Sequence, residues 1–272
     1  MSKKRKLFVF DLDGTLLTSE SHLSKANLAA LEAAKAKGHL LAVATGRNYE
    51  FTQLVLKDYW PMFDYYLGCN GALLHDLNQQ THWYASKAIN PDLIDYLTKK
   101  LATIGGGIQV STTWKVYTQL FLAYENQSFL NHTKKCYFDG WPAIATMSPE
   151  ERATIAQVSI HVDPEIINEI ALQIRADFAH LYAVTITSNT NIDINIKPVT
   201  KLFGIQEIVR RENLEENQVY VFGDSENDIP SLSYYDHSFA TANGLEDTKQ
   251  AAKTVIGSNN TDAIAKVVWE AL

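Results

Sequence analysis

The chain has 272 residues, of which 46% are hydrophobic and 20% charged, and its formal net charge at pH 7 is −7. This length suits two domains with a sizeable core, so no disulfide or structural metal is needed to stabilise the fold. The negative charge argues against nucleic acid or a membrane surface as a partner.

The first predicted element is a strand over Leu7–Phe10 that runs directly into Asp11. Four consecutive apolar residues indicate a strand buried on both faces, as in a parallel sheet. Asp11 then lies at the carboxyl end of the strand, where open α/β sheets bind ligands. Asp13 follows, and Gly14 permits a turn. Two ionised carboxylates this close repel each other, so we expect a bound cation or a retained proton, and either suits chemistry on a phosphate. An ordinary Asp-Gly turn is the structural alternative.

Strands and helices alternate through the next part of the chain. Ser24 is expected to cap a helix that runs to about Lys37, with Gly38 as its stop. Further along we predict a strand over residues 40–44, a helix from 48 to about 59 and a strand over 65–69. This alternation predicts a parallel, doubly wound sheet. Thr45 and Gly46 would follow the strand over residues 40–44.

The composition changes after about residue 80. We predict a helix over residues 91–103, strands over 108–111 and 115–117, a strand over 156–162, a helix over 164–178 and a strand over 182–187. Residues 120–147 mix aromatic and charged side chains, and no element is predicted there. These elements suggest a smaller α+β layer inserted into the core.

The core is expected to resume with a strand over Ile192–Ile196, in which apolar and polar residues alternate. Lys201 follows at the start of a helix to about Glu212. A buried strand over Gln218–Phe222 ends at Gly223 and Asp224. Two short strands, over residues 238–242 and 254–256, and a helix from about 261 complete the chain.

Carboxylates gather at two of the predicted strand ends. Asp11 and Asp13 follow one strand and Asp224 follows another, and these ends converge in a doubly wound sheet. Hard oxygen ligands with room for water describe a Mg²⁺ site. Asp228 lies four residues after Asp224, so both can face one side of a helix start. An acidic first helical turn without function is the alternative.

A phosphate group bound there would need hydrogen-bond donors. Thr45 offers a hydroxyl and an N–H group, and the backbone N–H groups of Gly46 and Leu12 are similarly placed. Lys201 can supply positive charge and Asn227 a side-chain amide. A turn threonine and a solvated lysine are the alternatives from residue type alone. Lys197 competes for the role of Lys201, and Arg47 could form an exposed salt bridge instead of binding an anion.

Four motifs occur in a recognisable order: Asp11–Thr15, Ala44–Arg47, Lys201, and Gly223–Asp228, with Asn70–Ala72 between the second and third. In this order they resemble the haloacid dehalogenase-like hydrolases, in the branch of the Cof-type sugar-phosphate phosphatases. The resemblance covers nearly the whole chain. It implies a Rossmann-like core domain over residues 1–82 and 188–272, with an inserted α+β cap domain for substrate specificity over residues 83–187.

The resemblance also implies an activity, Mg²⁺-dependent hydrolysis of small phosphorylated metabolites such as sugar phosphates. Asp11 would attack phosphorus and become an aspartyl phosphate. The side chain of Asp13 would protonate the leaving group and then activate water, while its backbone carbonyl would bind the metal beside Asp11 and Asp224. Asp228 would hold the water shell of the metal. The family pattern favours Lys201 over its competitor, because its lysine lies at that offset.

The sequence departs from the family pattern after the lysine, where Leu202 replaces the usual glycine, and after the last motif, where Ser231 and Leu232 replace the usual methionine. None of these changes removes a group that the chemistry requires. Two other functions stay open: a phosphomutase of the same superfamily, which returns the phosphoryl group to a second hydroxyl, and a signalling domain that uses Asp11 only as phosphoacceptor. The length and the acid/base Asp13 argue against the signalling domain.

The remaining features are uninformative about function. Cys69 and Cys136 lack metal-ligand spacing, and an inert buried thiol is expected at Cys69. No stretch reaches the roughly 20 apolar residues of a membrane-spanning helix, and the apolar run before Asp11 is too short for a signal peptide, so we expect a cytoplasmic protein. The partner is expected to be a small phosphate ester, with no nucleic acid and no membrane. The identity of that ester and the oligomeric state stay open.

Overall fold

The computed structural model describes residues 4–84, 88–121 and 138–272. It divides into two compact units. The first unit comprises Met1–Arg47, Phe51–Ala85 and Thr200–Leu272, and the second comprises Asn48–Glu50 and Ser86–Val199. None of the helices in the described ranges is long and apolar enough to cross a membrane. Most of the stretch for which no element was predicted, residues 122–137, lies outside the described residues.

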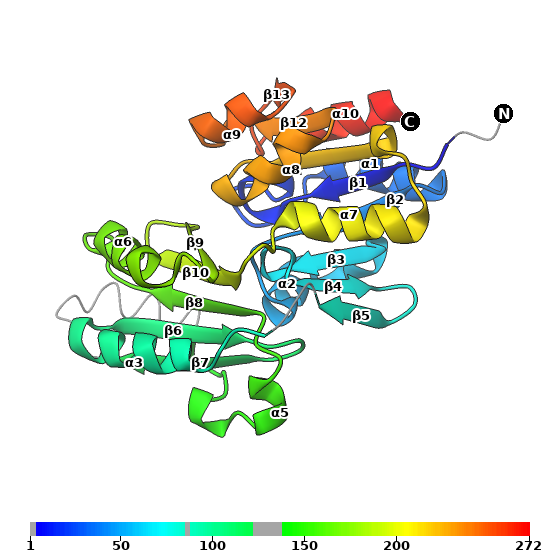
Figure 1. Cartoon of the computed structure of the whole chain (residues 1–272). Coiled ribbons are helices and arrows are strands. Elements are labelled where there is room, and N and C mark those ends of the chain that lie inside the picture. The colour runs from blue at the N-terminus through cyan, green and yellow to red at the C-terminus, as the bar shows by residue number, and fades with distance from the viewer. Residues whose placement is uncertain (1–3, 85–87, 122–137) are drawn as a thin grey trace. The chain divides into compact units, whose positions relative to one another are not determined.

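The first unit is built on a mainly parallel sheet (Figure 1). Among the described residues its strand order is β13-β12-β11-β1-β2-β3-β4-β5. The strands are β1 (Leu7–Phe10), β2 (Leu40–Ala44), β3 (Tyr65–Gly68), β4 (Leu73–Asp76), β5 (Thr81–Tyr84), β11 (Val219–Gly223), β12 (His237–Thr241) and β13 (Thr254–Ile256). Neighbours from β13 to β3 are parallel, whereas β4 and β5 are added antiparallel. The prediction found the parallel strands and missed the β4–β5 hairpin.

Helices cover both faces of this sheet, which confirms the doubly wound fold. They are α1 (Lys25–Ala36), α2 (Tyr49–Leu56), α7 (Lys201–Glu212), α8 (Ile229–Tyr234), α9 (Glu246–Ala251) and α10 (Ala263–Ala271). Alternate residues of β1 and β2, such as Leu7 and Val9, share one buried cluster with Ile205 and Ile208 of α7. Helices α1 and α10 contact each other and lie on the opposite face (Figure 1). Ser24 caps α1, since its side chain accepts a hydrogen bond from the backbone N–H of Asn27.

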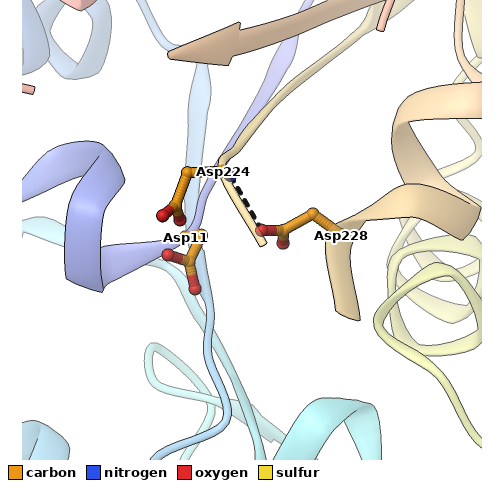
Figure 2. A group of neighbouring side chains, drawn as sticks. All are labelled: Asp11, Asp224 and Asp228. Atoms are coloured by element: carbon orange, nitrogen blue, oxygen red, sulfur yellow. Dashed lines mark hydrogen bonds between the residues drawn. The ribbon is translucent and has the colours of Figure 1, made fainter. Parts of the chain in front are cut away.

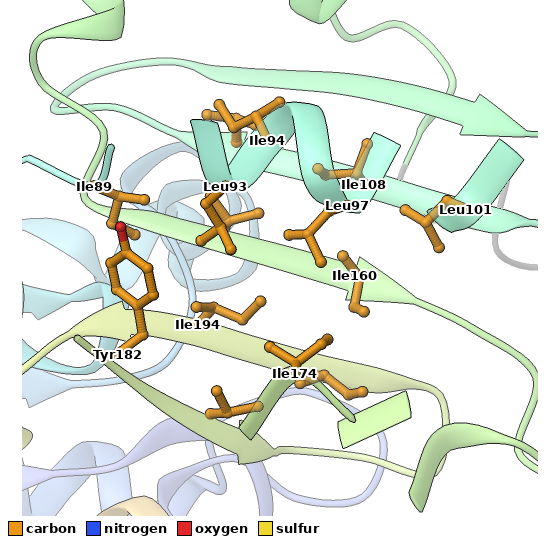
Figure 3. Packing of buried hydrophobic residues seen from close by; sticks show 14 of the residues in the cluster. Ile89, Leu93, Ile94, Leu97, Leu101, Ile108, Ile160, Ile174, Tyr182 and Ile194 are labelled. Atoms are coloured by element: carbon orange, nitrogen blue, oxygen red, sulfur yellow. The ribbon is translucent and has the colours of Figure 1, made fainter. Parts of the chain in front are cut away.

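The second unit contains an antiparallel sheet of order β7-β6-β8-β10-β9 in its described part. Its elements are α3 (Asp92–Ile104), β6 (Gly106–Ser111), β7 (Val116–Phe121), α5 (Pro149–Arg152), β8 (Gln157–His161), α6 (Ile167–Phe178), β9 (Tyr182–Ile186) and β10 (Asn191–Ile196). Apolar side chains of α3 and α6, including Leu97 and Ile174, pack on Ile108, Ile160 and Ile194 of one sheet face (Figure 3). The unit therefore has a hydrophobic core of its own.

Strand β10 corrects the sequence prediction. Residues 192–196 were expected to return the chain to the core sheet, but β10 pairs antiparallel with β8 and β9. The polar face of β10 explains why, because Asp193 accepts a hydrogen bond at 2.7 Å from the hydroxyl of Ser159 on β8. The chain re-enters the first unit at Thr200, not near residue 188.

Candidate functional site

The candidate site lies where four parallel strands of the first unit end side by side. Phe10 of β1 is in register with Phe222 of β11 and with Val43 of β2. In turn, β2 pairs with β3. The residues that follow these strand ends are Asp224 after β11, Asp11 after β1, Thr45 after β2 and Cys69–Gly71 after β3. The sheet topology alone thus brings the predicted motifs to one edge.

Three carboxylates form the centre of this edge. Each of Asp11, Asp224 and Asp228 has one carboxylate oxygen within 4.8 Å of the corresponding oxygens of the other two. Figure 2 shows the three side chains converging. Asp11 and Asp228 are buried. The carboxylate of Asp228 is fixed because its Oδ2 accepts hydrogen bonds from the backbone N–H groups of Asp224, at 3.0 Å, and of Ser225, at 3.1 Å.

Lys201 is the cation of this group. Its side chain is 1% exposed, and Nζ lies 2.7 Å from Oδ1 of Asp11 and 2.7 Å from Oδ1 of Asp228. Burial on its own would lower the pKa of Lys201, but the two carboxylates raise this pKa above its usual value, so the ammonium stays charged. Lys201 opens α7, whose N-cap Thr200 accepts a hydrogen bond from the N–H of Phe203.

The site has more negative than positive charge. Burial, opposed by Lys201 and reinforced by the neighbouring carboxylates, raises the pKa of Asp11 well above its usual range. Burial and the charge of Asp228 raise the pKa of Asp224 to about 6. A divalent cation would relieve this repulsion, and three converging carboxylate groups offer the hard oxygen ligands that Mg²⁺ or a similar ion prefers. The residues present therefore fit a divalent metal.

Asp13 lies apart from this carboxylate group. Its carboxylate is paired with the guanidinium of Arg47, with Nε 2.6 Å from Oδ2 and Nη2 2.9 Å from Oδ1. This is a forked ion pair, and the Asp13 side chain is 53% exposed. The sequence left open whether Arg47 binds an anion or forms a salt bridge, and the structure contains the salt bridge.

The other predicted phosphate-binding residues lie in the same loops as the carboxylates or in the loop after the neighbouring strand β2. Leu12 directly follows Asp11, and Gly46 follows Thr45, whose Oγ1 accepts a hydrogen bond from the N–H of Arg47. Asn227 lies between the two aspartates of its motif and donates its side-chain amide to Asn70. Lys197, the competitor of Lys201, instead donates to the carbonyl of Ala179 in the second unit.

The prediction missed two contributors. The hydroxyl of Thr15 donates a hydrogen bond to Oδ1 of Asp224 at 3.0 Å. Gly14, with φ +77°, passes so close to Asp224 that a Cβ atom there would lie 2.3 Å from its Oδ2. Both residues belong to the first motif, but their role depends on an aspartate more than 200 residues later, which no local pattern identifies.

The chain is similar to known proteins over nearly its whole length. The sequence model of the haloacid dehalogenase-like hydrolase family matches residues 8–268. A pyridoxal phosphate phosphatase of Escherichia coli is 26% identical over 98% of each chain. A 5-amino-6-(5-phospho-D-ribitylamino)uracil phosphatase of Bacillus subtilis is 22% identical, over 99% of this chain and 98% of the relative.

Solved structures share the fold over almost the entire chain. A haloacid dehalogenase-like hydrolase from Bacteroides thetaiotaomicron superposes with a TM-score of 0.82 at 18% identity, covering 99% of this chain and 100% of the other. A protein from Thermotoga maritima gives a TM-score of 0.79 at 22% identity, over 98% and 97% of the two chains.

Proposed function

Because the chain belongs to the haloacid dehalogenase-like hydrolases, with phosphatases among its relatives, we propose that it is a Mg²⁺-dependent phosphatase of small phosphomonoesters that forms an aspartyl phosphate on Asp11. The observation that carries this proposal is that the buried carboxylate of Asp11 lies beside the ammonium of Lys201 and close to the carboxylates of Asp224 and Asp228. A nucleophilic carboxylate held against one ammonium and a cation site is suited to an incoming phosphate group.

In the proposed first step, a carboxylate oxygen of Asp11 forms a bond to phosphorus while the bond from phosphorus to the leaving oxygen breaks. Lys201 holds Asp11 and offsets negative charge on the transferring group. Asp11, Asp224, Asp228 and the carbonyl of Asp13 would hold Mg²⁺, which would supply further positive charge at the site when bound.

Proton transfer is assigned to the side chain of Asp13. It gives a proton to the leaving oxygen in the first step. In the second step it takes a proton from the water that attacks phosphorus, and the bond to Asp11 breaks to release inorganic phosphate. Donors for the phosphoryl oxygens would come from Leu12, Thr45, Gly46 and Asn227.

We assign the second unit the role of a substrate-specificity cap. A phosphate bound by the first unit does not distinguish one metabolite from another, so groups elsewhere must contact the rest of the substrate. The named relatives act on a pyridoxal phosphate and on a phosphorylated ribityl compound. For this chain we propose the broader class of small phosphorylated metabolites, sugar phosphates included.

A panel of phosphomonoesters with Mg²⁺ tests the function. We expect release of inorganic phosphate from at least one ester, and no turnover by Asp11→Asn, whose amide cannot attack phosphorus. Asp236→Asn, at an exposed position, is the matched control and should keep full activity. Asp13→Asn should accumulate one phosphoryl group, detected by mass spectrometry of the protein.

Two results would contradict the proposal. A folded parent protein that releases no phosphate from any ester is not a phosphatase of this class, and full activity in Asp11→Asn excludes Asp11 as nucleophile. An isomer of the substrate, formed in place of free phosphate, would identify a phosphomutase.

A further inference from the structure

The turn after β3, Cys69–Gly71, has a backbone that only its surroundings can maintain. Its three residues have φ values of +50°, +57° and +92°. Asparagine and glycine tolerate this left-handed region, but a cysteine rarely adopts it, and such a conformation costs free energy unless neighbouring groups enforce it. Cys69 and Asn70 are both buried.

The backbone of the turn binds the loop after β2. The N–H of Cys69 donates to the carbonyl of Arg47 at 3.1 Å, and the N–H of Asn70 donates to the carbonyl of Thr45 at 3.1 Å. The hydroxyl of Tyr66 donates to the same Arg47 carbonyl at 2.9 Å. Three hydrogen bonds from β3 and its turn thus hold the segment that carries the predicted phosphate donor Thr45.

The side chain of Asn70 binds the loop after β11. The side-chain amide of Asn227 donates to Oδ1 of Asn70 at 2.8 Å. The Oδ1 atom of Asn227 is buried and has no hydrogen-bond partner among the described residues. The side chain of Asn70 therefore holds the amide of Asn227 in place.

Gly71 packs against the start of α7. A Cβ atom at Gly71 would lie 2.3 Å from the carbonyl oxygen of Thr200 and 3.1 Å from Cα of Lys201. Both contacts are with backbone, which cannot rotate away as a flexible side chain can. Only glycine permits this approach, and the approach sets the position from which Lys201 reaches Asp11.

We propose that Cys69–Gly71 positions the phosphate-binding groups, with Asn70 acting through Asn227 and Gly71 acting through Lys201. This inference rests on the proposed phosphatase function. The turn contacts three other parts of the chain: the loop that contains Thr45, the start of the helix that contains Lys201, and the loop that contains Asn227. A single turn therefore fixes their relative positions, which phosphoryl transfer requires because small displacements of positioning groups are costly.

The test of Gly71 is Gly71→Ala, with Gly38→Ala as its matched control. Gly38 has φ +80°, and a Cβ atom there meets nothing within 4 Å, so the control carries the same backbone strain without the contact. We expect Gly71→Ala to raise the inhibition constant of inorganic phosphate, measured with Mg²⁺, by about tenfold or more, because each lost charged contact to phosphate is of this order. Gly38→Ala should leave that constant unchanged.

The test of Asn70 is Asn70→Gly, which tolerates the left-handed backbone and removes the side chain that carries the amide. Loss of one hydrogen bond corresponds to about a 2- to 10-fold weaker affinity for inorganic phosphate. In an Asn227→Ala background, Asn70→Gly should have no further effect, since its partner is already absent.

Crystal structures of the variants separate this inference from the proposed function. We expect Nζ of Lys201 to lie beyond hydrogen-bond distance of Asp11 in Gly71→Ala and to stay in place in Gly38→Ala. If Lys201 is unmoved in Gly71→Ala, or if both glycine variants lose equal phosphate affinity, the turn is not a positioning element. If the parent hydrolyses no ester, the function is wrong, and the position of Lys201 still decides the inference.

Discussion

Two ion pairs of the site differ in how water affects them. Lys201 is 1% exposed beside Asp11 and Asp228, so its charge is weakly screened, and removal of one partner would leave a buried charge uncompensated. The pair of Arg47 and Asp13 is far more exposed, with 28% and 53% of the two side chains accessible. A pair of this kind contributes less than about 1 kcal/mol to folding. We propose that this pair instead orients the carboxylate of Asp13.

Arg47→Ala should therefore affect catalysis more than stability. We expect the free energy of unfolding to fall by less than about 1 kcal/mol. We expect kcat to fall, by less than the roughly 100-fold or more that loss of the acid/base itself would cause. Arg47→Lys should recover part of kcat, because lysine keeps the charge but not the fork.

Arg210→Ala is the matched control for Arg47→Ala. Arg210 makes a comparable fork with Glu207 on α7, and its side chain is 71% exposed. Stability and kcat should both be nearly unchanged. An unchanged kcat in Arg47→Ala as well would show that the fork does not orient the acid/base.

Buried histidine makes the second unit sensitive to acid. Burial lowers the pKa of His161 from 6.5 to about 3. As the pH falls, His161 therefore binds a proton in the unfolded protein before it does so in the folded protein. The resulting stability is fully present above pH 6.5 and is lost progressively as the pH falls toward the folded pKa. Each pH unit in this window lowers the free energy of unfolding by about 1.4 kcal/mol.

His161→Gln should remove that dependence. Between pH 6.5 and 4.5 the parent should lose roughly 2–3 kcal/mol more of its free energy of unfolding than the variant does, as measured by urea unfolding at several pH values. His180→Gln, at an exposed position, is the control and should follow the parent. Parallel pH profiles for the parent and His161→Gln would contradict this prediction.

At the scale of single elements, the end of β11 controls the position of Asp228. A Cβ atom at Gly223 would lie 2.4 Å from Cγ and 2.5 Å from Cβ of Asp228. Gly223 does not have a positive φ, so alanine adds no backbone strain there. The substitution must instead displace the carboxylate that receives the N–H groups of Asp224 and Ser225.

Gly223→Ala is expected to weaken the metal site. The Mg²⁺ concentration for half-maximal activity should rise about tenfold or more, because disturbing the groups that orient a metal ligand typically weakens metal binding by this factor. Gly257→Ala is the control, because its Cβ atom would crowd the Thr261 hydroxyl at 2.7 Å, outside the site. It should reduce stability without changing the Mg²⁺ requirement. Equal Mg²⁺ requirements in both variants would refute the role of Gly223.

The elements also indicate what a sequence can and cannot reveal. Strand β2 and helix α7 have the predicted bounds, because unbroken apolar runs, caps and stops are local signals. Strand β10 was found but placed in the wrong sheet, since alternation reports one buried face and not the partner strand. Asp11 and Asp224 could be proposed from their place after strands, whereas Lys201 was preferred to Lys197 because of its offset in the family pattern. The contacts of Asp224 with Thr15 and Gly14 could be seen only in the folded chain.

At the scale of the whole molecule, the limits of the second unit determine how it can be exchanged. Apart from Asn48–Glu50 it runs from Ser86 to Val199, and it includes β10 between β8 and β9. A chimera that replaces residues 86–199 with the corresponding part of a related phosphatase should fold, adopt the donor's ranking of substrates and keep the Mg²⁺ requirement.

A second chimera, exchanged over residues 83–187, supplies the control. It would combine a foreign sheet with the parent's β10, so that strand would have to pair with mismatched neighbours on both sides. We expect this chimera to unfold at lower temperature than the first. A folded 86–199 chimera that kept the parent's substrate ranking would place specificity in the first unit.

The interrupted path of the chain through its two units also bears on synthesis at the ribosome. Strand β1 has β11 as one neighbour, and Asp11 and Lys201 are 190 residues apart in the chain. The first unit cannot complete its sheet until β11, β12 and β13 have left the ribosome, whereas the strands and helices of the second unit come almost entirely from one continuous segment. We expect the second unit to become protease-resistant first, in nascent chains from which residue 200 but not yet β11 has left the ribosome, while β1 to β3 still await β11.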